Sequence, residues 1–116
     1  MGDLKKALDP VHEGIEIARF HGERVSELFL QRIRGALLYK DGRVKEAEAV
    51  LRDTIERSTK LNARSHALSA AIDLADAQRR SFSAFDGRES VRRILSTYDE
   101  GFDSPLVKRA QQIADD

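Results

Sequence analysis

The chain has no cysteine and no tryptophan, and only two prolines and one methionine occur among its 116 residues. Without cysteine, the protein has neither a disulfide framework nor a metal site built from thiolates. No apolar run approaches the roughly 18 residues of a membrane span, and the N-terminus lacks the apolar stretch of a signal peptide. These absences predict a cytoplasmic protein that does not bind a membrane.

An excess of either charge is also missing. Lys and Arg together number 20, and Asp and Glu together number 20, so the formal net charge is zero. Proteins that bind nucleic acids usually carry a basic excess or a basic stripe, so we expect no nucleic-acid partner. The hydrophobic content of 41% is enough for a core, and the length is that of a single domain.

Few groups have the spacing that catalysis or metal binding needs. The three histidines, His12, His21 and His66, form no pair at helical spacing, and no glycine-rich loop ends in Gly-Lys-Ser or Gly-Lys-Thr. Asp73 and Asp76 share one face of a predicted helix, and paired carboxylates can act as acid and base. Helix faces carry such charges routinely. We therefore expect no enzymatic activity, no metal and no cofactor.

The main positive feature is a repeat with a period of 40 residues. Identical residues recur at this spacing: Gly2 and Gly42, Lys5 and Lys45, Ala7 and Ala47, Ile15 and Ile55, Glu16 and Glu56, Arg24 and Arg64, and Leu28 and Leu68. A fixed period of this length is typical of a stacked array of helices. Within each half-period, apolar residues recur every three or four positions, which predicts helices. The sequence therefore predicts an all-α array of antiparallel helix hairpins.

The predicted helices number five long ones and a short last one: 3–20, 23–40, 43–60, 63–80, a fifth that ends near Tyr98, and 105–114. Gly22, Asn62 and Gly101 are predicted caps at helix ends. Pro10 predicts a kink or a restart of the first helix near residue 9. A polar break from Ser81 to Ser83 separates the fourth helix from the fifth.

The period divides the single domain into four parts: a half repeat (1–22), a full repeat (23–62), a degenerate repeat (63–101) and a C-terminal cap (102–116). Gly35 lies in the middle of a predicted helix, where glycine costs about 1 kcal/mol relative to alanine. Close approach of a neighbouring helix would offset that cost, and we expect Ala47 to be the small residue opposite Gly35.

The segment Gly-Ala-Leu-Leu-Tyr-Lys-Asp-Gly-Arg-Val-Lys-Glu-Ala, from Gly35 to Ala47, resembles a tetratricopeptide repeat from its first helix through the turn into its second. Leu38 and Leu51 occupy the large positions of that family, and Gly35 and Ala47 the small ones. Two family residues are replaced: the early tryptophan by Gln31 and the helix-ending proline by Thr59. The resemblance implies a superhelical array that binds a protein or a peptide.

A second resemblance covers nearly the whole chain and is carried by Ser26-Glu27-Leu28, Gly42-Arg43, Glu46-Ala47-Glu48, Ala63-Arg64-Ser65 and Asp99-Glu100-Gly101-Phe102-Asp103-Ser104. These residues are similar to the C-terminal end of large bacterial signalling and transcriptional regulators. In those proteins a cyclase-like or winged-helix domain and an ATPase module precede tetratricopeptide repeats. The chain contains neither catalytic module, so the resemblance implies no activity. In its second repeat Phe82 replaces the turn glycine and Gly87 stands at an alanine position, which predicts loose packing.

The family resemblance places the partner groove along the first helix of each repeat. By periodicity, residues of the second helix then lie beside residues of the fourth: Arg32, Ala36, Tyr39 and Lys40 beside Ile72, Asp73, Asp76 and Arg79. The alternative is that these residues form solvated outer faces. A group of arginines in the second hairpin, at positions 79, 80, 88, 92 and 93, suits an acidic or phosphate-bearing partner or is simply solvated.

The repeat phase also predicts an assembly surface. The first helix corresponds to the second helix of a hairpin, and no first helix precedes it in this sequence. An apolar strip on it should therefore be uncovered and form a two-fold homodimer interface: Leu4, Leu8, Val11 and Ile15. Two alternatives to a protein-binding module stay open, namely a detached regulatory tail of a cyclase or ATPase-type regulator, and an all-α DNA-binding regulator.

Overall fold

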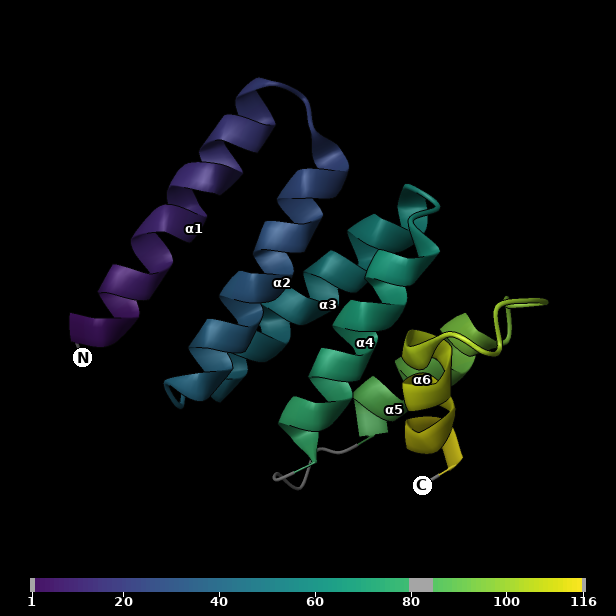
Figure 1. Ribbon diagram of the computed structural model, residues 1–116. Helices are drawn as coiled ribbons and strands as arrows, with labels where there is room; N and C mark the ends of the chain where they lie inside the picture. Colours follow the sequence, from purple (N-terminus) through teal and green to yellow (C-terminus); the bar gives the residue numbers. More distant parts are fainter. Residues whose placement is uncertain (1, 80–84, 116) are drawn as a thin grey trace.

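Six α-helices follow one another along the chain in the computed structural model, which describes residues 2–79 and 85–115. They are α1 Gly2–Phe20, α2 Arg24–Lys40, α3 Val44–Lys60, α4 Arg64–Gln78, α5 Phe85–Leu95 and α6 Pro105–Asp115. Each helix packs against the next one in sequence, and α4 also contacts α2 and α6. Figure 1 shows α1 and α6 at opposite ends of the array, with α4 near its centre. The predicted all-α array of helix hairpins is confirmed.

Three residues with positive φ turn the chain between the first four helices. They are Gly22, Gly42 and Asn62, with φ of 69°, 84° and 57°. At each turn a backbone N–H reaches back past the helix end; the N–H of Glu23, for example, donates to the carbonyl of Ala18 at 2.8 Å. The predicted caps at Gly22 and Asn62 are confirmed. Because the turns lie 20 residues apart, successive helices return in register and the period of 40 follows.

Two helix boundaries differ from the expected ones. α1 runs through Pro10 without a restart, because apolar residues on both sides of the proline, such as Leu8 and Ile15, pack in one helical register; the other alternative, a kink near residue 9, stays a prediction. α5 ends at Leu95 and not near Tyr98. The hydroxyl of Thr97 donates to the carbonyl of Ile94 at 2.7 Å, a side-chain bond that competes with continuation of the helix. Gly101 has a positive φ of 78° but lies in the α5–α6 connection, so it does not cap α5.

The core is centred on α4. Half of the eight buried residues of α4 are alanines. Five of the eight are at most 1% exposed: Ala67, Leu68, Ala70, Ala71 and Leu74. Residues of α3, α5 and α6 complete the same cluster, among them Leu51, Val91 and Ala110. Short side chains on α4 let helices approach it from several sides, so the alanine-rich sequence fits a central position in the array.

Gly35 has the predicted packing role, but its closest neighbours were predicted incorrectly. A Cβ added at Gly35 would lie 2.9 Å from Cδ2 of Leu51 and 3.5 Å from Cγ1 of Val50. The large side chain of Leu51 therefore fills the space above Gly35. Antiparallel helices joined by the turn at residues 41–43 place position 35 opposite position 50 or 51, whereas Ala47 lies opposite Leu38. Ala47 is nevertheless fully buried.

Gly87 shows that the second repeat is tightly packed, so the predicted loose packing is wrong. A Cβ at Gly87 would overlap the backbone N and Cα of Ala75, which means that α5 and α4 touch backbone to backbone. The N–H of Gly87 donates to Oε1 of Gln78 at 2.8 Å, and Nε2 of Gln78 donates to Oε2 of Glu48 at 2.9 Å. Gln78 thus ties α3, α4 and α5 together. The predicted break around Phe82, including Ser81 and Ser83, lies outside the described residues.

Substitution of Gly87 by alanine should destabilise the protein by about 1–3 kcal/mol, because helix backbone, unlike a flexible side chain, cannot move aside. Gly14→Ala is the matched control, since the new Cβ would meet only the end of the Leu30 side chain at 3.0 Å and alanine favours the helix. Urea unfolding followed by circular dichroism measures both. Equal midpoints for Gly87→Ala and wild type would contradict the close α4–α5 contact.

Candidate functional site

Ion pairs connect the three helices that follow one another across one face of the array, α2, α4 and α6, which we call the inner face. Nε of Arg32 on α2 lies 3.1 Å from Oδ2 of Asp73 on α4. Nη2 of Arg109 on α6 donates to Oδ1 of Asp76 on α4 at 2.7 Å. The sequence predicted that Arg32 and Asp73 lie together, and they do. The contact of α6 with Asp76 was not predicted.

The other residues of the predicted groove differ in exposure. Ala36, Lys40 and Arg79 are exposed, and Tyr39 is half-buried. Ile72 is only 7% exposed and belongs to the core cluster. Because Ile72 is buried in the core, it does not line a groove. Its neighbour Asp73 is the residue of that turn that contacts α2.

An apolar hollow of about 430 Å³ lies at the beginning of α2 and α4. It is lined by Val25, Ser26, Phe29 and Leu30 of α2 and by His66 of α4. Val25 and Phe29 are large apolar residues, yet they are 47% and 44% exposed. They occupy the same stripe as Arg32 and Ala36, at spacings of three and four residues. The guanidinium of Arg32 lies 5.7 Å from the ring centre of Phe29, so the hollow and the Arg32–Asp73 pair form one continuous surface, the inner-face site.

Asp73 has an unusual protonation equilibrium. The pKa of its carboxyl is raised from 3.8 to about 6, because burial and, to a smaller extent, the charge of Asp76 raise it more than the charge of Arg32 lowers it. A carboxyl with a raised pKa in a cleft is a common feature of functional sites and also of structural ion-pair networks. Asp73 and Asp76 each face an arginine, so their arrangement differs from a carboxylate pair that shares one proton.

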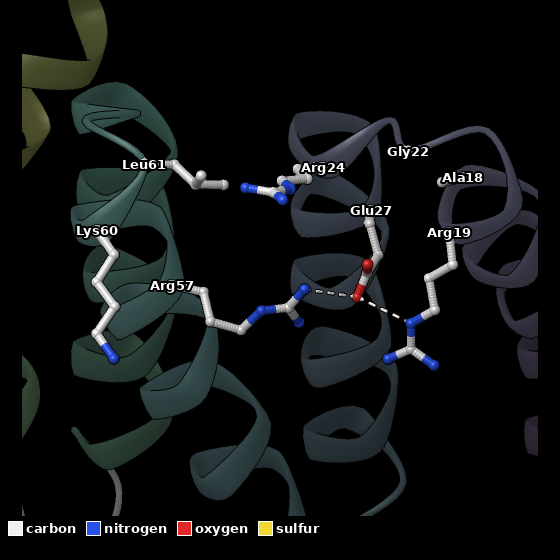
Figure 2. Close-up of a pocket in the computed structure, with 8 residues that line it drawn as sticks. All are labelled: Ala18, Arg19, Gly22, Arg24, Glu27, Arg57, Lys60 and Leu61. Carbon is white, nitrogen blue, oxygen red and sulfur yellow. Dashed lines mark hydrogen bonds and ion pairs between the residues drawn. The ribbon is translucent and has the colours of Figure 1, made fainter.

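A second hollow, of about 520 Å³, lies between the ends of α1 and α3 and the beginning of α2. Figure 2 shows its basic lining of Arg19, Arg24, Arg57 and Lys60 around a single carboxylate, Glu27. Glu27 is 5% exposed. Its Oε2 accepts from Nη2 of Arg57 at 2.8 Å and lies 3.2 Å from Nε of Arg19, so that Glu27 links three helices. Burial by itself raises the pKa of Glu27, but the hydrogen bond and charge of Arg57, with the charge of Arg19, lower it overall.

The basic hollow has the chemistry of a site for a small oxyanion. In Figure 2, Arg24 and Arg57 extend from α2 and α3 into the same opening, and the guanidinium of Arg24 has no hydrogen-bond or ion-pair partner in the described part of the chain. Arg19, Arg57 and Lys60 also lie in the last turns of α1 and α3. Cations at these positions stabilise the helix dipole whether or not an anion binds.

The predicted dimer strip is mostly turned toward the protein itself. Ile15 is 4% exposed, and Leu4, Leu8 and Val11 are half-buried. Leu4 and Leu8 share a hollow with Leu38 of α2. The prediction that these four residues leave an uncovered strip is therefore wrong, because they form the face of α1 that packs on α2.

The arginines of the second hairpin are partly structural. Nε and Nη2 of Arg92 donate to the carbonyl of Ala114 at 2.9 and 2.7 Å, so Arg92 caps the end of α6. Arg80 lies outside the described residues. Within residues 2–79 and 85–115, no group of three His, Asp or Glu side chains is placed to hold a metal ion. None of the described helices is long and apolar enough to cross a membrane.

Comparison with known proteins gives no relative: no family model matches the chain, and no curated protein or solved structure matches it.

Glu27→Gln should lower the free energy of unfolding by about 2 kcal/mol at neutral pH, as expected when a hydrogen-bonded charge is lost. The lowered pKa of Glu27 means that this stabilisation is present above the ordinary value of 4.5 and is lost as the pH falls through the folded-state value. Arg24→Gln, in the same hollow, should change stability by less than about 0.5 kcal/mol. Denaturant unfolding at several pH values tests both. Equal effects of the two substitutions would contradict the linking role of Glu27.

Asp73→Asn should have the opposite pH dependence. Because the folded protein raises the pKa of Asp73 from 3.8 to about 6, it binds the proton more tightly than the unfolded chain, and wild-type stability falls as the pH rises through this range. Asparagine cannot ionise, so the variant should gain in melting temperature relative to wild type above pH 6 and lose that gain below pH 4. A difference in melting temperature that does not vary with pH would contradict this assignment.

Proposed function

We propose that this protein is a non-catalytic helical-repeat module that binds a protein or peptide at the inner-face site. The observation that carries the proposal is the exposure of Val25 and Phe29 in a hollow beside the Arg32–Asp73 ion pair. Large apolar side chains exposed next to paired charges are typical of surfaces that accept an apolar anchor residue. A ligand with one apolar side chain flanked by charged residues fits this surface.

The resemblance to tetratricopeptide repeats supports the same function, because helices that correspond to α2 and α4 line the groove in that family. With the similarity to the tails of bacterial regulators, it favours a role in bacterial signalling or transcriptional regulation in the cytoplasm. The alternative within this picture is a detached regulatory tail of a cyclase or ATPase-type regulator. A DNA-binding role is disfavoured by the zero net charge, and it predicts binding that weakens steeply with salt.

The chemistry of the acidic residues supports a binding role over a catalytic one. Asp73 and Asp76 are engaged by arginines from two different helices, Arg32 and Arg109. Catalytic carboxylates need access to a substrate proton, whereas carboxylates held by arginines position helices and present a mixed-charge surface. A partner protein or peptide requires only such a surface.

Selection of peptides from a displayed random library on the immobilised protein tests the proposal. Selected peptides should carry an apolar anchor, and fluorescence anisotropy should show that Phe29→Ala weakens their binding by about tenfold or more, in the range of a hot-spot residue. Arg32→Glu combined with Arg79→Glu should abolish binding and leave the helical circular dichroism signal intact.

Phe102→Ala is the matched control, because Phe102 is 46% exposed but lies in the α5–α6 connection, away from the inner-face site. If peptides bind Phe29→Ala and the folded double arginine variant as tightly as wild type, the site is not on this face.

A further inference from the structure

The period of 40 residues allows each surface of α1 and α2 to be compared with the same surface one repeat later. One such surface of α3 and α4 includes Ala47, Thr54, Ala70 and Ala77, and none of these is more than 2% exposed. The adjoining positions also contact α2: Arg57 binds Glu27, and Asp73 binds Arg32. In the second repeat this surface is therefore covered by α2.

In the part of the chain that the structure describes, no helix packs on the same surface of the first repeat. We call it the N-terminal edge and define it by Ala7, Pro10, Gly14 and Ile17 on α1 with Leu30, Ile33 and Leu37 on α2. Ile17 is 52% exposed and Pro10 is exposed, and the other five are half-buried. Ile17 corresponds to Arg57, and Ile33 to Asp73, so apolar residues replace the two charges that face α2 in the next repeat. The edge is thus more apolar than its covered counterpart.

The opposite end of the array is finished differently. α6 occupies the position of α2 and α4 one repeat further on, and its residues Ala110 and Ile113 are buried. Polar residues stand on α6 where the earlier repeats have buried ones. Lys108 corresponds to Leu28 and Leu68, which are both fully buried, Gln111 corresponds to Gln31, and Asp115 corresponds to Gly35. A polar outer face is how helical arrays cap an end. Because α6 is polar at these positions, head-to-tail stacking of copies would place charged and amide groups against the apolar N-terminal edge, which is unfavourable.

We propose that the N-terminal edge pairs with the same edge of a second copy about a two-fold axis, through α1. A two-fold axis perpendicular to α1 makes the two α1 helices antiparallel, which is also how α2 lies against α3. The small residues Ala7 and Pro10 let the two helices approach closely, and Ile17 of each copy is removed from water. Leu30 borders both the edge and the inner-face site, but Lys6, Glu13 and Ile17 on α1 lie outside that site, so substitutions there test the dimer separately from the proposed function.

Charges along α1 favour this antiparallel arrangement. Lys6 and Glu13 flank the apolar strip of α1 on the side away from α2, one on each side of Pro10. Both are exposed, and neither has an ion-pair partner within the described residues. A two-fold axis near Pro10 brings Lys6 of one copy opposite Glu13 of the other, twice per dimer.

Light scattering after gel filtration should show dimers of the wild-type protein at high micromolar concentration. Ile17→Glu should raise the dimer dissociation constant by about tenfold or more, because it buries an unpaired charge. Phe102→Glu, which places the same charge at an exposed apolar position outside the edge, should leave the dimer intact. Substitutions at Leu8 or Val11 are unsuitable, because those residues pack on α2 and their loss would unfold α1.

A charge exchange tests the two-fold geometry itself. Lys6→Glu alone and Glu13→Lys alone should each weaken the dimer, since each places like charges opposite one another. A mixture of the two variants should form a heterodimer, because both contacts then regain opposite charges. A monomeric wild type, a dimer unaffected by Ile17→Glu, or a mixture that dimerises no better than either variant alone would overturn the proposal.

Discussion

The close approach of successive antiparallel helices is the constraint on which the array depends. At the α2–α3 crossing Gly35 makes room for Leu51, and at the α4–α5 crossing Gly87 allows contact with the backbone of Ala75. Glycine has a different role at each crossing. Gly35 leaves space for a large side chain, whereas Gly87 lets the backbones of two helices come into contact. Both fix the distance between helices, and that distance decides which polar groups can meet. The bond from Gln78 to Gly87, and through Gln78 to Glu48, exists only because α5 lies this close.

Once the spacing is fixed, two carboxylates experience opposite environments. Glu27 meets two guanidinium groups, which more than compensate for its burial and lower its pKa. Asp73 meets Arg32 but also Asp76, and burial dominates, so its pKa rises. The first carboxylate stabilises the contact of three helices at neutral pH, and the second weakens the fold when it ionises. The weakening occurs at Asp73, which lies next to the exposed apolar residues of α2 through its ion pair with Arg32.

The sequence was sufficient to predict where the helices lie in the chain but not which side of each helix is buried. Regular spacing of apolar residues, with Gly22 and Asn62 at the turns, predicted the first four helices to within a few residues, because local chemistry determines where a helix ends. Periodicity cannot tell a stripe that faces the core from a stripe that faces solvent. Ile15 was therefore predicted to be uncovered and Ile72 to line the groove, although both are buried. The prediction of loose packing at Gly87 was wrong for a related reason. A residue without a side chain suggests weak packing unless the position of the neighbouring backbone is known. Arg109 was missed because nothing local in the sequence relates α6 to Asp76.

The informative residues are those that break the repeat. Arg64 corresponds to Arg24, and it donates to the carbonyl of Thr97 at 2.8 Å and lies 5.0 Å from the ring centre of Tyr98. In the first repeat those two partner positions are Arg57 and Ser58, so Arg24 faces a cation where Arg64 faces a carbonyl and an aromatic ring. Glu27 likewise becomes Ala67. Both differences concentrate charge in the first hairpin, in a chain whose total charge is zero. The core positions Leu28 and Leu68 are identical, which shows that helix packing is common to both repeats, whereas the surfaces around it are not. The two repeats therefore share one scaffold and differ in the surface chemistry that each presents.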